Sequence, residues 1–232
     1  MVVHDRLADH RIVDLARPGA RRIAVGKRAG FHPVPQEKIN ALLIDLARAG
    51  LRVVRLKGGD PFIFGRGSEE AAALREAGIP VEIVPGITAA QGVAASTGVP
   101  LTHRGIATGV RYVTGHRKGD APLDLDWRSL ADPETTLVVY MGAANIAEIA
   151  GNLIAAGMPA GMPVLAVSRA TLPDEMRLSS TLGQIGADCA ARHLPSPVLF
   201  VIGRAVAMAE AMPDLVRQAA ARQTAAFGRI HA

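Results

Sequence analysis

Short apolar stretches rich in β-branched residues alternate along the chain with amphipathic stretches of helical period. This alternation is typical of βαβ units, so the sequence predicts an α/β fold built largely on parallel strands. The apolar stretches predict strands over residues 22–25, 52–56, 81–84, 110–114, 136–141, 164–167 and 198–202. The opening Val2-Val3-His4-Asp5 is typical of a strand end that runs into polar residues.

Two helices are predicted in the first half of the chain. The first begins at Pro35 and ends before Gly50, because proline favours a helix start and glycine a helix end. Four apolar residues repeat between them at helical spacing, namely Ile39, Leu42, Leu43 and Leu46. The second helix is predicted over residues 68–77, with Ser68 as its N-cap and Gly78 as its stop.

A change of domain is predicted where the first series of these units ends. The segment from Gly115 to Asp126 is polar and contains glycine, so we place the change between Pro100 and Gly109. The sequence therefore predicts an N-terminal α/β domain over residues 1–105 and a C-terminal α/β domain over 106–212. Residues 213–232 are rich in Ala, Gln and Arg and predict a terminal helix or tail.

Composition narrows the class of protein. The chain has 232 residues, of which 49% are hydrophobic and 20% charged, as in ordinary soluble globular proteins. No apolar run approaches the roughly 18 residues of a membrane span, and no secretion signal is present, so a cytoplasmic protein is expected. The single Cys189 allows no internal disulfide or zinc cluster, and the seven histidines lack paired-ligand spacing. No metal is expected.

The positive charge could indicate either a nucleic acid or a small anionic partner. The net charge is +5, and the cations are 22 arginines and only four lysines. Basic residues are scattered and aromatic residues make up 3%, so nucleic-acid binding is not expected. Arginine offers a planar fork for carboxylates, which fits a polycarboxylate partner, although a GC-rich genome explains the same bias.

The densest candidate for chemistry runs from Leu56 to Gly67, between a predicted strand and a predicted helix. Its adjacent Gly58 and Gly59 remove side chains at the carboxyl end of a strand, where open α/β sheets bind ligands. Asp60 adds a carboxylate that can accept from an amine or a ribose hydroxyl. A tight turn with Asp60 as a cap explains the same residues.

A second strand end and turn follow in Val84-Pro85-Gly86-Ile87-Thr88-Ala89-Ala90. Thr88 can cap the next helix, and that helix N-terminus can also receive the polar end of a ligand. Spacing alone leaves both roles open. Met141 ends another apolar strand, where core packing and ligand contact are both open.

Several segments, taken together, resemble the S-adenosylmethionine-dependent uroporphyrinogen-III C-methyltransferases within the tetrapyrrole methylase superfamily. The resemblance runs in order over about residues 2 to 210, and the Gly-Gly-Asp-Pro-Phe-Ile-Phe-Gly-Arg-Gly string is its most specific part. The matching segments are 4–7, 25–30, 34–37, 52–67, 84–89, 100–104, 113–116 and 140–142.

The resemblance implies two α/β domains with a cofactor cleft between them, and a homodimer. It implies successive transfer of two methyl groups from S-adenosylmethionine to ring carbons of uroporphyrinogen III, giving precorrin-2 for sirohaem, cobalamin or haem d1. The family's acid and base match Asp5 and Lys27. Without the resemblance, both would be taken as surface groups, although a lysine at position 27 can release a proton once its pKa is lowered.

Binding residues are also implied residue by residue. The cofactor contacts carried over are Gly58, Gly59, Asp60, Ile63, Thr88, Ala89, Met141 and Ala170. Arg66 and Glu69 match the substrate site, and Arg104 is a further candidate for the substrate carboxylates, with a structural salt bridge as its alternative.

The sequence departs from the family pattern in two places, which limits what the resemblance implies. The family normally begins with a strand and a Gly-x-Gly-Pro-Gly-Asp loop that this sequence lacks, and the usual Tyr before the Asp is His4. We therefore expect an incomplete cofactor wall. The alternatives are a sister methylase that acts on a later corrin precursor, rRNA or diphthamide, and a non-catalytic remnant that binds a tetrapyrrole or a partner.

Overall fold

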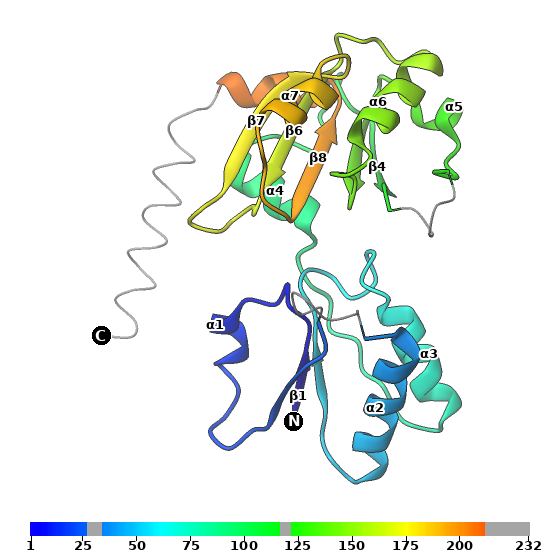
Figure 1. Cartoon of the computed structure of the whole chain (residues 1–232), viewed down its shortest axis with the longest axis vertical. Helices are drawn as coiled ribbons and strands as arrows, with labels where there is room; N and C mark the ends of the chain where they lie inside the picture. The colour runs from blue at the N-terminus through cyan, green and yellow to red at the C-terminus, as the bar shows by residue number, and fades with distance from the viewer. Residues whose placement is uncertain (27–33, 117–121, 212–232) are drawn as a thin grey trace. The chain divides into compact units, whose positions relative to one another are not determined.

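The computed structural model describes residues 1–26, 34–116 and 122–211. They form two compact units that divide between Thr88 and Ala89, each with its own sheet (Figure 1). The domain boundary predicted from the sequence, after residue 105, remains a prediction. The compact units divide earlier because helix α4 (Ala89–Thr97) packs against strand β8 (Val198–Ile202) of the second sheet.

The first unit holds a three-stranded parallel sheet in the order β2-β1-β3. Strand β1 (Val2–His4) lies between β2 (Arg22–Ala24) and β3 (Val54–Leu56), and a short helix α1 (His10–Val13) follows β1. Helices α2 (Gln36–Arg48) and α3 (Gly67–Glu76) pack against each other (Figure 1). Because β1 is central, the residues that follow it lie at the middle of the sheet's carboxyl edge.

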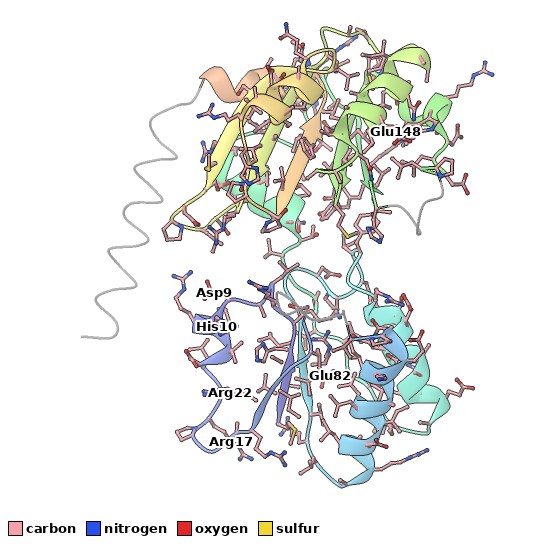
Figure 2. The ribbon with its side chains drawn as sticks, in the orientation of Figure 1. Asp9, His10, Arg17, Arg22, Glu82 and Glu148 are labelled. Carbon is pink, nitrogen blue, oxygen red and sulfur yellow. The ribbon has the colours of Figure 1, made fainter. Side chains whose placement is uncertain are left out.

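The small core of this unit follows from the helical spacing read in the sequence. Val3, Val25, Ile39 and Leu43 form one buried cluster, in which Ile39 and Leu43 lie one helical turn apart on α2. At the start of α1, the Asp9 side chain accepts a hydrogen bond from the Arg11 amide, as an N-cap (Figure 2). This N-cap hydrogen bond therefore stabilises the start of α1, the shortest described helix of the unit.

Two predictions for this unit are wrong. Residues 81–84 form no strand, because among the described residues β3 pairs only with β1 and no strand reaches them; Val84 is 72% exposed. Ser68 is not an N-cap, since α3 begins one residue earlier, at Gly67, and Arg66 holds the cap position in a left-handed conformation.

The second unit holds a five-stranded mixed sheet in the order β4-β5-β8-β6-β7. Its remaining strands are β4 (Gly109–Thr114), β5 (Thr135–Tyr140), β6 (Pro163–Ser168) and β7 (Met176–Thr181). The other helices are α5 (Trp127–Leu130), α6 (Ile146–Ala155) and α7 (Ile185–Ala191), and the 3-10 helix η1 (Arg204–Ala211) follows β8.

The prediction of largely parallel strands needs correction for this sheet. Strands β4 and β5 are parallel, but β8 runs antiparallel to both β5 and β6, and β6 and β7 form an antiparallel pair. All five residues of β8 are buried, which is why its apolar run was recognisable in the sequence. Strand β7 was missed because only Leu178 of its six residues is buried.

Candidate functional site

The first group of candidate residues lies at the carboxyl edge of the three-stranded sheet. Asp5 follows β1, and its amide donates to the carbonyl of Leu56, at the end of β3, across 3.4 Å. The loop over residues 57–66, which we call the glycine loop, leaves this same edge. Parallel strands thus bring Asp5 and the glycine loop together, at the edge where open α/β sheets bind ligands.

Asp5 is held by the backbone that follows it. Its Oδ1 accepts from the amides of Leu7 and Ala8, both at 3.1 Å. His4 is buried, and its Nδ1 lies 3.1 Å from the Asp5 carbonyl oxygen. One carboxylate oxygen is therefore fixed in place, while Oδ2 accepts no hydrogen bond from the described residues.

Lys27, the predicted partner of Asp5, lies outside the described residues. Gly26, the last described residue before it, packs closely on the turn after Asp5: a Cβ at Gly26 would lie 2.5 Å from the Arg6 amide nitrogen. The end of β2 and the residues after Asp5 are thus neighbours. The pairing of Asp5 with Lys27 remains a prediction.

The glycines of the glycine loop are required by packing and backbone conformation. A Cβ at Gly58 would lie 2.9 Å from Leu7 Cβ, and Gly59 has a left-handed φ of 79°. Leu7 therefore occupies the space beside Gly58 that the sequence interpretation gave to a ligand. Phe62 and Phe64 of this loop are 51% and 39% exposed, so apolar surface surrounds the turn.

Asp60 joins the two turns that the sequence identified separately. Its Oδ1 accepts from the Phe62 amide at 2.8 Å and its Oδ2 from the Gly86 amide at 3.0 Å. These bonds, that from Gly86 first, hold the pKa of the Asp60 carboxyl below its usual value. Asp60 is thus a structural link, as the turn interpretation expected, and any ligand contact would add to that role.

The Asp60 link predicts an acid-sensitive contribution to stability. A carboxyl whose pKa is lowered by folding stabilises the protein above its unfolded pKa of about 3.9, and this is lost as the pH falls through the folded value. We expect Asp60→Ala to lower the melting temperature at pH 7, and the difference from the wild type to shrink below about pH 4. Thermal unfolding at several pH values measures this. Asp45→Ala, at an exposed position, is the control; a pH-independent difference would contradict the prediction.

Arg66 and Glu69 form a pair at the start of α3. Arg66 Nε donates to Glu69 Oε1 at 2.9 Å, and its terminal nitrogen lies 2.6 Å from Oε2. The bond from Arg66 lowers the pKa of Glu69, and that carboxylate raises the pKa of Arg66. Both side chains are about half exposed, at 53% and 51%, so the pair is reachable by a charged ligand.

Two candidate residues of the second unit follow the carboxyl ends of β5 and β6, which lie at the same edge of the mixed sheet. Met141 follows β5, is 50% exposed and has a left-handed φ of 53°, and Ala170 lies between Arg169 and Thr171, which are also left-handed. The Ala90 amide, beside Ala89, donates to the Tyr140 hydroxyl at 3.1 Å.

The start of α4 therefore lies against the side chain of Tyr140, the last residue of β5. Met141 is not core filler, which the sequence had left open. Non-glycine residues in left-handed conformation are often found at ligand sites, and here three of them lie at one sheet edge.

Arg104 belongs to the second unit, and no hydrogen bond or ion pair joins it to the other candidate residues in the described part of the chain. It is exposed in the turn between His103 and Ala107 and makes no ion pair to the described residues. The structural salt bridge that the sequence had left open is therefore absent from the described part of the chain. Thr88, the last residue of the first unit, is buried.

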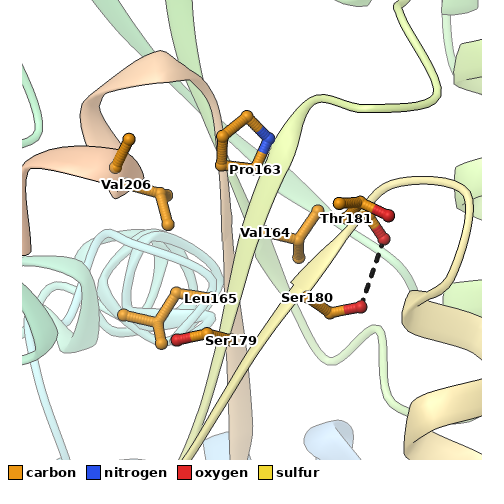
Figure 3. Close-up of a pocket in the computed structure, with 8 residues that line it drawn as sticks. Pro163, Val164, Leu165, Ser179, Ser180, Thr181 and Val206 are labelled. Carbon is orange, nitrogen blue, oxygen red and sulfur yellow. Dashed lines mark hydrogen bonds between the residues drawn. The ribbon is translucent and has the colours of Figure 1, made fainter. Parts of the chain in front are cut away.

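A pocket in the second unit contains none of the predicted site residues. It has a volume of about 250 Å³ and lies between the first residues of β6, the last residues of β7, and Val206 and Ala207 of η1 (Figure 3). Pro163, its first β6 residue, begins that strand, whereas Ala170 follows the other end. The pocket therefore lies at the edge of this sheet opposite to Met141 and Ala170.

A buried charged cluster, which the sequence did not predict, lies below the glycine loop. Glu70 Oε1 lies within 3.3 Å of side-chain nitrogens of Gln36, Arg55 and Lys57. A lysine directly before two glycines, in a chain with only four lysines, was the available signal. Groups of three or more histidines, cysteines or acidic residues that could hold a metal ion are absent from the described ranges.

A family model described as Tetrapyrrole (Corrin/Porphyrin) Methylases matches residues 1–186. The chain is a tetrapyrrole methylase. The recognised family is thereby confirmed, and the α/β fold agrees with it. Across the residues that the structure describes, helices are too short or too polar to cross a membrane.

Three individual relatives of this tetrapyrrole methylase are informative. It is 63% identical over 210 residues to the uroporphyrinogen-III C-methyltransferase of Paracoccus denitrificans, covering 90% of this chain and 73% of that protein. It is 49% identical to the sirohaem synthase of Hahella chejuensis over 90% of this chain, but spans only 44% of that protein.

The third relative is a crystal structure. The uroporphyrin-III C-methyltransferase of Thermus thermophilus, in complex with S-adenyl homocysteine, aligns with a TM-score of 0.75 and 41% identity. That alignment covers 89% of this chain and 86% of the Thermus chain. The match therefore extends over both compact units rather than over one of them.

Proposed function

We propose that this tetrapyrrole methylase transfers two methyl groups from S-adenosylmethionine to ring carbons of uroporphyrinogen III, giving precorrin-2. The observation that carries the proposal is the 63% identity to a uroporphyrinogen-III C-methyltransferase over 90% of the chain. The Thermus relative supports the methyl donor, since its structure holds the demethylated product of that donor. The product would supply sirohaem or cobalamin synthesis.

The chemistry asks mainly for alignment and proton handling. In each transfer the bond from the methyl carbon to sulfur breaks, a carbon–carbon bond forms, and a neutral thioether leaves. The ring carbon attacks as an enamine-like nucleophile, so the substrate must lose a proton as the new bond forms. Asp5, whose Oδ2 accepts no hydrogen bond from the described residues, suits the base, and Lys27 is proposed as the acid.

The methyl donor is proposed to bind along the sheet edges described above. In the first unit its contacts are Gly58, Gly59, Asp60, Ile63 and Thr88, and in the second Ala89, Met141 and Ala170. Backbone groups of the glycine loop and exposed apolar side chains such as Phe62 suit a ligand with both polar and apolar parts. Asp60 would contribute mainly through the shape of the loop, because two amides already bond its carboxylate.

The tetrapyrrole is a polycarboxylate, and Arg66, Glu69 and Arg104 are proposed to receive it. Glu69 now occupies the fork of Arg66. A substrate carboxylate could take the place of Glu69, which would then be available to accept from a pyrrole N–H. The pair thus offers groups for both kinds of polar atom on such a substrate.

Removing the Arg66 charge should weaken tetrapyrrole binding selectively. A charge-assisted hydrogen bond contributes about 1.5–3 kcal/mol, so Arg66→Leu should raise KM for uroporphyrinogen III by about tenfold or more. KM for S-adenosylmethionine should change little. Steady-state kinetics with each substrate varied separately measures both values. Arg75→Leu, at an exposed arginine of α3, is the control. An unchanged KM in Arg66→Leu would remove Arg66 from the substrate site.

A homodimer and a cytoplasmic location complete the proposal, both from the family resemblance. Sedimentation at micromolar protein concentration tests the assembly, and a monomer that is fully active would contradict the dimer. Nucleic acid and membranes are not proposed partners.

Product analysis tests the activity itself. The protein is incubated without oxygen with S-adenosylmethionine and uroporphyrinogen III, precorrin-2, ribosomal RNA or the diphthamide-bearing elongation factor in separate reactions. Methylation of uroporphyrinogen III alone supports the proposal. Methylation of another substrate, or tetrapyrrole binding without turnover, would replace it with one of the alternatives considered from the sequence.

A further inference from the structure

Four side chains meet below the glycine loop in a buried cluster with unusual charge balance. Lys57 Nζ lies 3.1 Å and Arg55 Nη2 3.3 Å from Glu70 Oε1, and Gln36 Nε2 donates to the same oxygen at 3.2 Å. The side chains of Glu70 and Lys57 are only 5% and 8% exposed, and that of Arg55 is 14% exposed. Two cations thus share one carboxylate oxygen away from water.

Such a cluster is a poor device for stability alone. Desolvation of a buried ion pair offsets much of its attraction, and neutral replacements of similar size are often as stable. Burial, and then repulsion by Arg55, lowers the pKa of Lys57, only partly opposed by Glu70. Burying Lys57 beside Arg55 therefore costs folding free energy. The position of the cluster under the glycine loop points to a role other than stability.

The cluster connects the two ends of the glycine loop on its buried side. Lys57 is the first residue of the loop, and Glu70 lies in the first turn of α3, directly after the loop ends. The Lys57 side chain runs below the loop, since its Cε would lie 3.3 Å from a Cβ at Gly65. The Lys57–Glu70 pair therefore joins the two ends of the loop and packs beneath its middle.

The loop needs such a constraint, because its backbone is strained. Phe64 and Arg66 have left-handed φ values of 52° and 58°, although neither is glycine. A left-handed conformation is unfavourable for a residue other than glycine, and it persists only where surrounding contacts determine it. Arg66 is itself half of the exposed Arg66–Glu69 pair.

We propose that Lys57 is a positioning residue for methyl transfer, acting through its buried pair with Glu70 to hold the glycine loop and Arg66 in their binding geometry. Lys57 touches neither ligand in this role. The inference rests on the proposed function, because it takes the glycine loop as the binding segment for the methyl donor.

The test separates positioning from stability with a charge-matched double variant. Lys57→Met keeps the length and apolar character of the side chain, and Glu70→Gln keeps the shape of the acceptor. Together they remove one positive and one negative charge, so the net charge of the cluster is unchanged. We expect the double variant to melt within a few degrees of the wild type.

At a temperature where every variant is folded, the double variant should bind S-adenosylhomocysteine about tenfold more weakly and turn over about 10- to 100-fold more slowly. Calorimetry and product formation measure the two effects. Lys38→Met, at an exposed lysine of α2, controls for loss of a lysine, and should behave as the wild type. Leu43→Ala, in the core, controls for lower stability, and should keep its affinity while folded.

Wild-type affinity and turnover in the folded double variant would overturn the proposal. Failure of the double variant to fold would also overturn it, by making the cluster a purely structural element. If the wild type binds S-adenosylhomocysteine but does not methylate uroporphyrinogen III, the proposed function fails, while the comparison of affinities still decides the role of Lys57. A wild type that binds no S-adenosylhomocysteine would remove both.

Discussion

Asp5→Asn is expected to lower turnover about 100-fold or more, the usual scale for loss of a general base. Asparagine keeps an oxygen that can accept from the amides of Leu7 and Ala8, so the turn after β1 should persist. What is lost is the basic carboxylate. Stopped-time assays of product formation, with calorimetry for cofactor affinity, should give a large fall in rate with nearly unchanged binding.

Lys27→Ala should reduce turnover similarly, and the double variant should be far less impaired than the product of the single effects, because both residues would act on the same proton inventory. Asp9→Asn is the matched control, since asparagine caps a helix as well as aspartate does and Asp9 pairs with Arg11 rather than with the site. Full activity in either single variant would remove that residue from the catalytic assignment.

Gly86→Ala is expected to lower the free energy of unfolding by about 3 kcal/mol and to weaken S-adenosylhomocysteine binding at least tenfold. A Cβ at Gly86 would lie 2.4 Å from the Gly59 carbonyl oxygen, so the two turns must move apart. That movement would also break the hydrogen bond from the Gly86 amide to Asp60. Denaturant unfolding and calorimetry measure the two effects.

Gly151→Ala is the control for this substitution. Apart from its chain neighbours and the backbone of its own helix, no described atom lies within 4 Å of a Cβ at Gly151, which is inside α6. Alanine there should therefore raise stability by about 1 kcal/mol through helix propensity. Unchanged affinity in Gly86→Ala would show that the contact between the two turns does not shape the ligand site.

The sequence predicted those elements whose burial leaves a clear pattern. The fully apolar run was sufficient to predict β8, and the helical spacing of Ile39 and Leu43 was sufficient to predict α2. In both elements these apolar residues are buried. Residues 81–84 look like a strand, yet pairing depends on a neighbour that no local pattern reveals. Strand β7 escaped because its polar, largely exposed residues resemble a loop.

The candidate site was predictable to different degrees at different residues. The turns around Gly59 and Gly86 were visible as strand ends, but their link through Asp60 joins residues 26 positions apart and needs the tertiary structure. The role of Leu7 beside Gly58 was equally hidden, since a glycine pair does not say what fills the space. Lys57 and Glu70 lay within the recognised motif, but only the fold places both side chains on one side of the loop.

The activity proposed for this chain is the transfer of two methyl groups to uroporphyrinogen III. Its most direct test is a reaction without oxygen in which the donor carries an isotopically labelled methyl group. The tetrapyrrole product is then analysed by mass spectrometry, and released S-adenosylhomocysteine is counted. We expect two labelled methyl groups on ring carbons and two molecules of S-adenosylhomocysteine for each molecule of product. Unlabelled tetrapyrrole recovered from a folded protein that binds both ligands would contradict it.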